Sequence, residues 1–565
     1  MNDDLTRRTF LKQTGASVAA WAAASAGHAR QNAPPSELTA QQHRVVEIEW
    51  QSMAHYPDGY NDVELDVACT RPDGSTFTAP AFWDGGTRWK FRFAGAQLGE
   101  YRLESRTNQV DDAGLNAQRR VVRVEAGVGD NPLYRHGRLR VAEDRRHLEH
   151  ADGTPFLWIG DTWWMGLTTR LDWPAGFQWL TSDRVEKGFS VVQIIAGPYP
   201  DMDAWDPRGR SEAGFPFEDG FQRINPAYYR AADRKIQHLV ESGLMPCIVG
   251  MWGYYLPQLG LDKVRRFWRY LIARYGAYPV TWCLCGEATM PYYLSQDREA
   301  DAARQKTGWT EVMAYVRQTD GYRNLITIHP THYGREQVED PSLMDFEMLQ
   351  TGHGDIDSVP RVIESVRRSV AASPRMPVIN SEVNYEGIMG RSWQNIQRLD
   401  FYHTMMNGAA GFTYGANGIW QLNTEEQPYG PSPHGRSWGS TPWRVAARLP
   451  GSEQVGLGGR FFRQHPWWEL ERHPEWIDEP RKDNDAYGPV AAGIPGRLRI
   501  VYSPHCWNPP RVRGFEPGVD YSASWFDPVA GVESLIGSVE PDADNAWTPP
   551  FPSEVHDWLL VLRAE

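Results

Sequence analysis

Between residues 131 and 470, short apolar runs alternate with segments that carry apolar residues at helical spacing. The apolar runs cover residues 155–161, 189–196, 244–252, 280–287, 325–329, 344–350, 376–382 and 411–414. Helix-like segments include residues 226–242, 262–275, 310–319 and 359–372. Eight strand–helix repeats predict a (β/α)8 TIM barrel of the α/β class. A doubly wound open sheet is the alternative, but it would lack eight regular repeats, and the sequence has no glycine-rich phosphate loop.

Both flanks of this region have the pattern of β structure. Short alternating runs separated by Pro-Asp-Gly and Asp-Gly-Gly turns predict an N-terminal β-sandwich over residues 31–130. Short apolar runs between Pro- and Gly-rich turns predict a C-terminal β-sandwich over residues 481–565. We therefore expect the barrel to occupy residues 131–480 between the two sandwiches.

Residues 1–30 have the pattern of an export signal. Arg7 and Arg8 precede a weakly apolar, Ala-rich stretch that leads to small residues near Ala29, which is typical of a twin-arginine signal peptide. A basic amphipathic start is the alternative. No other run approaches the roughly 18 residues of a membrane-spanning helix. We expect a periplasmic or secreted mature protein without a membrane span.

Charge and composition exclude several kinds of partner. The chain has 71 acidic against 58 basic side chains, a net charge of −13, so the basic footprint of a nucleic-acid-binding protein is missing. Five cysteines are too few and too scattered for a disulfide framework, and no CxxC or His pair completes a metal site. The 25 Trp residues suit the faces of sugar rings. We expect an oligo- or polysaccharide substrate and neither cofactor nor metal, with the oligomeric state left open.

Two glutamates follow predicted strands at the edge where barrel enzymes bind substrate. Glu287 ends the fourth apolar run and Glu382 the seventh. The tips of these strands face each other across a barrel, and glycosidic bonds are cleaved by two carboxyl groups that flank one atom. A gap of about 5 Å would give a retaining mechanism, with Glu287 as acid/base and Glu382 as nucleophile. Glu386, Asp161 and Asp201 are the substitutes for either role.

Other strand tips carry side chains that suit sugar hydroxyls and sugar rings. The candidate substrate-binding residues are Asp161, Trp163, Trp164, Gln193, Tyr199, Trp252, Tyr254, His329, His332, His353, Asn384 and Trp420.

Other functions compete with this hypothesis. The three histidines and Asp161 could ligate zinc, but they lack HxH or HExxH spacing. No GxSxG motif indicates an esterase. A non-catalytic carbohydrate-binding barrel remains open, in which Trp163, Trp252 and Trp420 grip the sugar. A polysaccharide lyase also remains open, with Tyr254, Tyr385 or His329 as base.

Three motifs carry a resemblance to a known family. FLWIGDTWW at 156–164, KGFSVVQ at 187–193 and PGSEQVG at 450–456, with the Phe pair at 461 and PWW at 466–468, resemble the apiosidase-like glycoside hydrolases. These are clan A barrels that act on plant and bacterial polysaccharides. The resemblance implies a fourth-strand acid and a seventh-strand nucleophile, which map onto Glu287 and Glu382. It also implies exo-action on pentofuranosides, apiose- or arabinofuranose-like, in polysaccharide side chains.

The chain departs from this family beside the predicted acid. The family commonly has Asp after a Gly pair, whereas this chain has Cys285-Gly286-Glu287. The wider clan usually precedes its acid with an Asn that touches the sugar 2-hydroxyl, which Gly286 cannot do. FWDG at 82–85 resembles the immunoglobulin-like domain often fused ahead of such barrels, and YSASWFDP at 521–528 resembles their C-terminal sandwich cap.

Overall fold

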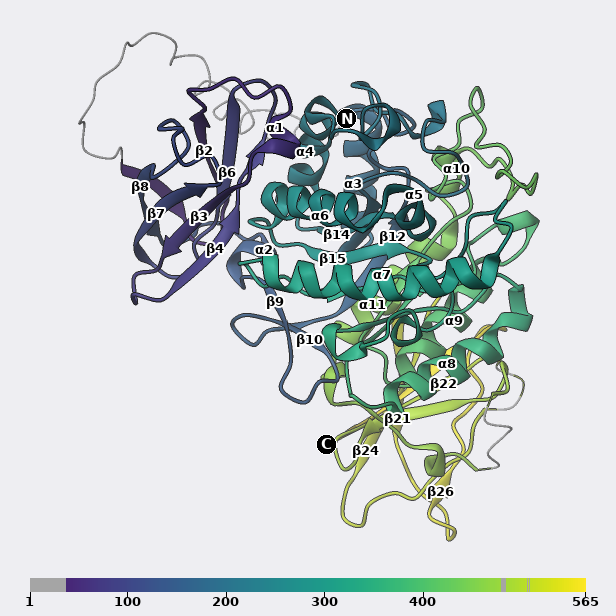
Figure 1. Cartoon of the computed structure of the whole chain (residues 1–565). Helices are drawn as coiled ribbons and strands as arrows, with labels where there is room; N and C mark the ends of the chain where they lie inside the picture. Colours follow the sequence, from purple (N-terminus) through teal and green to yellow (C-terminus); the bar gives the residue numbers. More distant parts are fainter. Residues whose placement is uncertain (1–36, 479–483, 506, 508) are drawn as a thin grey trace, which may run out of the picture.

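The computed structural model of the protein describes residues 37–478, 484–505, 507 and 509–565. The predicted export signal lies outside the described residues. In chain order, the structure has an N-terminal group of β sheets, a central barrel and a C-terminal β sheet (Figure 1). No helix among the described residues is long and apolar enough to cross a membrane.

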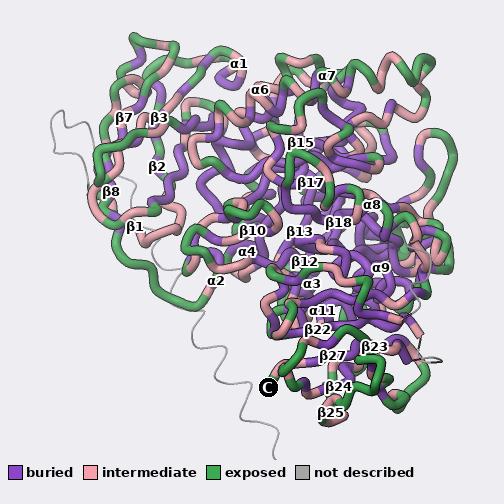
Figure 2. Tube along the Cα trace, turned by 90° about the horizontal axis from the view of Figure 1, so that it is seen from below, coloured by how far each residue is buried: buried purple, intermediate pink, exposed green. Residues whose placement is uncertain are grey.

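The centre of the molecule is a nearly closed parallel barrel of eight strands, which confirms the predicted fold. The strands are β12 (Trp158–Trp163), β13 (Val191–Ile195), β14 (Met245–Trp252), β15 (Thr281–Gly286), β16 (Ile326–Thr327), β17 (Glu347–Gln350), β18 (Val378–Glu382) and β19 (Gly411–Tyr414). Each corresponds to one predicted apolar run. Every residue of β12 to β15 is buried, as expected of parallel strands covered on both faces (Figure 2).

The barrel closes between β16 and β17, where strand pairing is replaced by other hydrogen bonds. The Thr327 hydroxyl donates to the Phe346 carbonyl over 2.8 Å, and the Asp345 amide donates to the Ile326 carbonyl over 2.9 Å. The Ile326 amide donates back to the Asp345 carboxylate over 2.7 Å. Strands β16 and β17 are shorter than the predicted runs.

Helices surround the barrel. They are α3 (Ala175–Glu186), α4 (Pro226–Glu241), α5 (Leu256–Leu259), α6 (Leu261–Tyr275), α7 (Arg298–Thr319), α8 (Val359–Ala371), α9 (Gln394–Met406), α10 (Trp443–Ala446) and α11 (Pro450–Arg463). Helix α7 begins earlier than the predicted residue 310. Its first turn is capped by Asp297, whose side chain accepts a hydrogen bond from the Ala300 amide.

The N-terminal region consists of two sheets beside α4 and α6 (Figure 1). The larger sheet orders β1 (Glu37–Gln41), β8 (Arg119–Glu125), β7 (Gly99–Thr107), β3 (Leu65–Thr70) and β4 (Thr76–Pro80); the smaller orders β2 (Val46–Gln51), β6 (Arg88–Phe93) and β5 (Phe82–Trp83). Burial alternates along β2 and β3, as the sequence pattern predicts. Helices α1 (Gly59–Asp62) and α2 (Pro132–Arg135) and the small sheet of β9 (Leu139–Val141), β10 (Leu148–His150) and β11 (Pro155–Phe156) complete this part.

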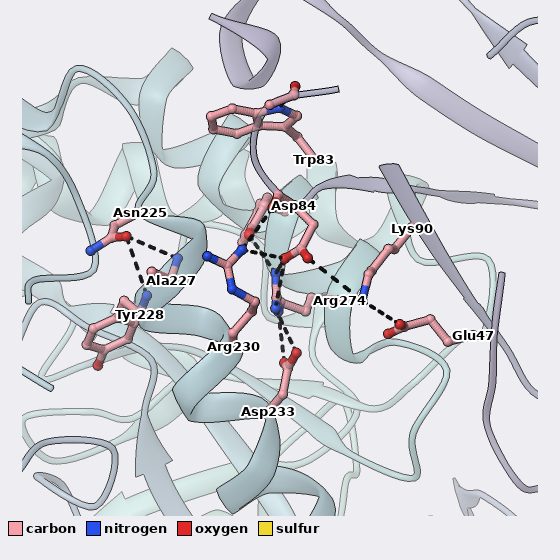
Figure 3. A network of polar contacts seen from close by, with 12 residues as sticks. Glu47, Trp83, Asp84, Lys90, Asn225, Ala227, Tyr228, Arg230, Asp233 and Arg274 are labelled. Carbon is pink, nitrogen blue, oxygen red and sulfur yellow. Dashed lines mark hydrogen bonds and ion pairs between the residues drawn. The ribbon is translucent and has the colours of Figure 1, made fainter. Parts of the chain in front are cut away.

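A network of ion pairs fixes the N-terminal sheets to the barrel (Figure 3). Asp233 of α4 pairs with Arg274 of α6 at 2.7 Å and with Arg92 of β6 at 2.6 Å. Asp84, which follows β5, lies 3.3 Å from Arg230 of α4. Removing one partner from a buried network of this kind typically costs about 3–5 kcal/mol, because the other charge is left without compensation. The network therefore favours one fixed orientation of the two parts.

The C-terminal sheet packs beneath the barrel on the side of α8, α9 and α11 (Figure 1). It orders β20 (Glu471–Arg472), β21 (Val490–Ile494), β22 (Leu498–Ser503), β27 (Trp558–Ala564), β24 (Tyr521–Asp527) and β25 (Val532–Ser538), beside the pair β23 (Val512–Arg513) and β26 (Ala546–Trp547). It has an apolar core of its own. Arg398 of α9 pairs with Asp557 at 2.5 Å, which ties this sheet to the barrel.

Candidate active site

A cavity of about 360 Å³ opens at the carboxyl ends of the barrel strands. The lining residues that were named from the sequence are Glu287, Glu382, Asp201, Trp164, Trp252, His353, Tyr385 and Trp420. The other lining residues are Pro200, Met290, Tyr293, Arg298, Gln350, Ile388, His434, Arg436 and Trp438. Most of these residues lie at strand ends or in the loops that follow, where barrel enzymes place their catalytic groups.

Glu287 directly follows β15 and has a positive backbone φ of 41°. Non-glycine residues rarely adopt this conformation, and where they do the strain often marks a functional site. Burial and the nearby charge of Glu382 raise the pKa of Glu287 to about 8. At neutral pH Glu287 therefore holds a proton that it can donate.

Glu382 is the last residue of β18, and two imidazoles contact its carboxylate. Nε2 of His353 lies 3.0 Å from Oε1, and Nε2 of His329 lies 3.3 Å from Oε2. Burial alone would raise the pKa of Glu382, but the contacts with both histidines lower it below its ordinary value. Glu382 is therefore ionised at neutral pH, as a nucleophile requires.

The side-chain amide of Gln350, at the end of β17, joins the two glutamates. Its Nε2 donates to Oε1 of Glu287 over 3.1 Å and to Oε1 of Glu382 over 2.8 Å. Because one nitrogen makes both bonds, these two oxygens lie no more than 5.9 Å apart, the combined length of the bonds. An irregularity in the β17–β18 register between Leu349 and Gln350 sets Gln350 opposite Glu382.

Trp252 explains the glycine before Glu287. Trp252 and Gly286 are register partners on β14 and β15, and a Cβ at position 286 would lie 2.1 Å from Cζ3 of the indole. No asparagine fits there while Trp252 holds this position. The departure from the clan pattern at Gly286 is thus coupled to an aromatic wall that lines the cavity.

Several predicted residues lie behind the cavity wall rather than in it. The Asp161 carboxylate accepts hydrogen bonds from Arg184 at 2.5 Å and from the Trp163 indole at 2.8 Å. The Trp163 ring packs edge-on against Phe177 of α3. Gln193 lies in the barrel interior and donates to the Ser381 carbonyl over 3.1 Å. We therefore expect no substrate contact from Asp161, Trp163 or Gln193.

Other predicted residues are engaged elsewhere. The Tyr199 hydroxyl contacts that of Tyr228, and the Tyr254 hydroxyl donates to the Tyr199 carbonyl over 3.2 Å. His332 contacts the Ser365 hydroxyl at 2.9 Å, and the Asn384 amide donates to the Asp400 carboxylate over 2.9 Å. The sequence pattern could not show these partners. His329 is fully buried behind the cavity wall, where it contacts Glu382 and packs on the Trp164 and Trp252 rings.

The three alternative catalytic carboxylates, Asp161, Asp201 and Glu386, differ in whether they line the cavity. Asp161 is paired with Arg184. Glu386 accepts hydrogen bonds from the Gly451 amide at 3.0 Å and from the Tyr414 hydroxyl at 2.5 Å, outside the cavity wall. Asp201 alone of the three lines the cavity.

Sequence reasoning missed part of the wall. Gln350 ends the sixth predicted strand and could have been found by the rule that named the other tips. Tyr385, named from the sequence only as a possible base of a lyase, stacks between the rings of His353 and Trp420, with centroid distances of 4.8 Å and 5.9 Å. Tyr293 and the segment around His434 come from long loops that show no periodicity.

The part of the chain that the structure describes contains no ligand set for a metal ion. No group of three or more His, Cys, Asp or Glu side chains is arranged there to hold a metal ion. The histidines of the zinc alternative are separated, since His332 contacts Ser365 whereas His329 and His353 contact Glu382.

A parallel barrel with two glutamates of opposite protonation at the ends of β15 and β18 defines a glycosidase of the barrel type. The model of the apiosidase-like catalytic domain matches residues 142–469, more than half of the chain. The chain therefore belongs to the apiosidase-like family. A second model, of a domain of unknown function (DUF5060), matches residues 39–108. A search among curated proteins finds no match.

Solved structures share this fold. A glycoside hydrolase has a TM-score of 0.62 at 21% identity, over 77% of this chain and 98% of its own. A glycoside hydrolase family 5 protein from Bacteroides vulgatus ATCC 8482 has a TM-score of 0.63 at 22% identity, over 77% and 95%. A further structure from the same organism reaches 0.69 at 16% identity, over 94% and 100%.

Proposed function

We propose that this protein is an exported, retaining and exo-acting glycoside hydrolase that cleaves pentofuranoside linkages, apiose- or arabinofuranose-like, in polysaccharide side chains. The observation that carries the proposal is the pair Glu287 and Glu382, bridged by one amide and held in opposite protonation states.

The pair supports a two-step displacement. The ionised Glu382 attacks the anomeric carbon while Glu287 gives its proton to the leaving oxygen, so that the glycosidic C–O bond breaks as the glycosyl–enzyme bond forms. Glu287, now a carboxylate, then removes a proton from water, which attacks the anomeric carbon and releases Glu382. The imidazoles of His329 and His353 keep Glu382 ionised and oriented.

The spacing of the carboxyl groups supports retention of configuration. Retaining glycosidases hold the two groups about 5–5.5 Å apart, and inverting ones about 6.5–9.5 Å apart. The bridged oxygens of Glu287 and Glu382 lie within 5.9 Å, below the inverting range. A short spacing of this kind leaves less room for the water molecule that inversion places between sugar and base, which supports the proposal of retention.

The remaining parts of the proposal have separate supports. The cavity of about 360 Å³ is at the small end for ligand pockets, which suits a terminal sugar unit rather than a long chain. The pentofuranoside preference follows the resemblance at 156–164 and 187–193. Export follows the paired Arg7 and Arg8 of the sequence.

Hydrolysis of a panel of aryl pentofuranosides and hexosides tests the proposal. We expect activity of the wild type, strongest on a pentofuranoside, and its loss in Glu287→Gln and Glu382→Gln. Proton NMR of the first product should show the anomer of the substrate. Wild-type-like turnover in both variants would contradict the assignment of the pair, and initial release of the opposite anomer would contradict retention.

A further inference from the structure

One carboxylate of the cavity has no part in the catalytic pair. Asp201 lies in the loop after β13 and lines the same cavity as Glu287 and Glu382. Its side chain is buried, with 7% exposed. Its charge adds to the effects of burial and Glu382 that raise the pKa of Glu287. The cavity therefore holds three carboxyl groups, one more than retaining hydrolysis uses.

The Asp201 carboxylate is buried without a cation in direct contact, and the charges of His434 and Arg208 act on it only from further away. Two other buried aspartates pair with an arginine, Asp161 with Arg184 and Asp557 with Arg398, whereas the buried Asp400 accepts a hydrogen bond from the Asn384 amide. Among the residues that the structure describes, no Lys, Arg or His nitrogen lies within 4.0 Å of the Asp201 carboxylate. Its protein partner is the Tyr293 hydroxyl, which donates to Oδ1 over 2.7 Å. Burial of a carboxylate without a paired cation is unfavourable, and such groups are enriched at functional sites.

The fold holds Asp201 in place despite this cost. Its backbone has a positive φ of 58°, which is strained for a non-glycine residue. Tyr293, its hydrogen-bond donor, stacks on His434 at 4.9 Å between ring centroids. Tyr293 uses only Oδ1, so the other carboxylate oxygen is left as an acceptor for a ligand.

Other groups in the wall complement this acceptor. The Trp420 indole N–H is a donor without a partner among the described residues, and the Trp420 side chain is only 5% exposed. A sugar ring with several hydroxyls offers both donors and acceptors to such a wall. A ring that carried its own carboxylate would lie among three acidic groups. The arginines that line the cavity, Arg298 and Arg436, are exposed and so belong to its outer part.

We propose that Asp201 accepts hydrogen bonds from hydroxyl groups of the sugar unit whose anomeric carbon lies beside Glu382. It thereby makes the buried end of the cavity selective for a neutral, polyhydroxylated sugar over a uronic acid. This inference rests on the proposed function, because that function places the anomeric carbon at Glu382.

A matched pair of variants tests the role of Asp201. Asp203, two residues on, accepts a hydrogen bond from Tyr292 as Asp201 does from Tyr293, but Asp203 is exposed and does not line the cavity. Each variant, Asp201→Asn and the control Asp203→Asn, carries this single substitution. We expect Asp201→Asn to lower kcat/KM about 10–100-fold, the size of a hydrogen bond to a charged group. Asp203→Asn should leave it unchanged.

Monodeoxy analogues of the best aryl glycoside separate sugar binding from a structural role. The analogue that lacks the bound hydroxyl should be a poor substrate of the wild type, and Asp201→Asn should cause no further loss on it. Equal loss on every analogue, or equal behaviour of the two variants, would overturn the inference. Thermal unfolding confirms that both variants are folded.

Binding to the inactive Glu382→Gln enzyme distinguishes this inference from the proposed function. Ligand-observed NMR with free arabinose, galactose and galacturonic acid should show that a neutral sugar binds and that the uronic acid does not. Introducing Asp201→Asn as a second substitution should weaken the binding of the neutral sugar. If neutral sugars bind through Asp201 but the wild type hydrolyses no glycoside, the proposed function fails and the inference stands. Binding of galacturonic acid in the cavity, or of no sugar, would overturn the inference.

Discussion

The ends of β15 and β18 hold the same side chain in opposite states. Glu287 and Glu382 line one cavity and accept hydrogen bonds from the same Gln350 nitrogen. At β15, burial and the neighbouring charge raise the pKa of Glu287 to about 8. At β18, burial acts in the same direction on Glu382, but His329 and His353 outweigh it and lower the pKa.

The difference shows that the partners of each glutamate, and not its burial, set its protonation state. Desolvation disfavours the charged form of both carboxyl groups, whereas a donor or cation beside one of them favours its charged form. The imidazoles contact Glu382 alone. Changes to each side should therefore have distinct kinetic effects.

The largest effect is expected when the β15 side loses its acid. Glu287→Ala should lower kcat/KM by about 10²–10⁴-fold on a glycoside with a poor leaving group, the usual contribution of general acid catalysis. A dinitrophenyl glycoside should lose much less in the glycosylation step, because its leaving group departs without a proton. Initial rates on the two substrates measure this. Glu299→Ala, at an exposed position of α7, is the control. Equal loss on both substrates would contradict the assignment of Glu287 as acid.

A smaller effect is expected when the β18 side loses one imidazole. His353→Asn removes the contact at 3.0 Å that lowers the pKa of Glu382. The pKa of Glu382 should then rise, so that the acidic limb of the kcat/KM profile moves to higher pH. We expect a loss of about 10–100-fold at neutral pH, the size of one hydrogen bond to a charged group.

His332→Asn is the matched control for this change. His332 follows β16 but contacts Ser365 and does not line the cavity. Its replacement should leave the acidic limb in place. A shift of equal size in both variants would mean that the limb does not report Glu382.

The barrel could be predicted because parallel strands buried on both faces are continuous apolar runs. Their ends also indicated where polar side chains would gather, which led to Glu287 and Glu382. The position of a residue at a strand end could not show which of two consecutive residues faces the cavity. Trp163 and Trp164 were both predicted to bind substrate, yet successive side chains point to opposite faces, and Trp163 packs on Phe177 while Trp164 lines the cavity.

The outer wall could not be predicted from local patterns. Tyr293, His434 and Trp438 lie in loops whose course depends on contacts distant in sequence, such as the stacking of Tyr293 on His434. The position of Gln350 opposite Glu382 depends on the register irregularity after Leu349. A strand pattern contains no signal for such an irregularity.

The smallest effect is expected at Gln350, which contacts both sides. Its hydrogen bond lowers the pKa of Glu287, so Gln350→Met should raise that pKa further. The rate of the wild type should fall above about pH 8, as Glu287 loses its proton, and this basic limb should move to higher pH in the variant. The acidic limb should also move up, because Glu382 loses the same donor.

This pattern of shifts distinguishes the Gln350 amide, which contacts both glutamates, from the His353 imidazole, which contacts Glu382 alone. We expect both limbs of the kcat/KM profile to move by less than about one pH unit in Gln350→Met, since one nitrogen divides its hydrogen bonds between two carboxylates. In His353→Asn only the acidic limb should move. If the basic limb stays fixed in Gln350→Met while the acidic limb moves, the amide serves Glu382 alone, and the bridge cannot be what couples the two glutamates.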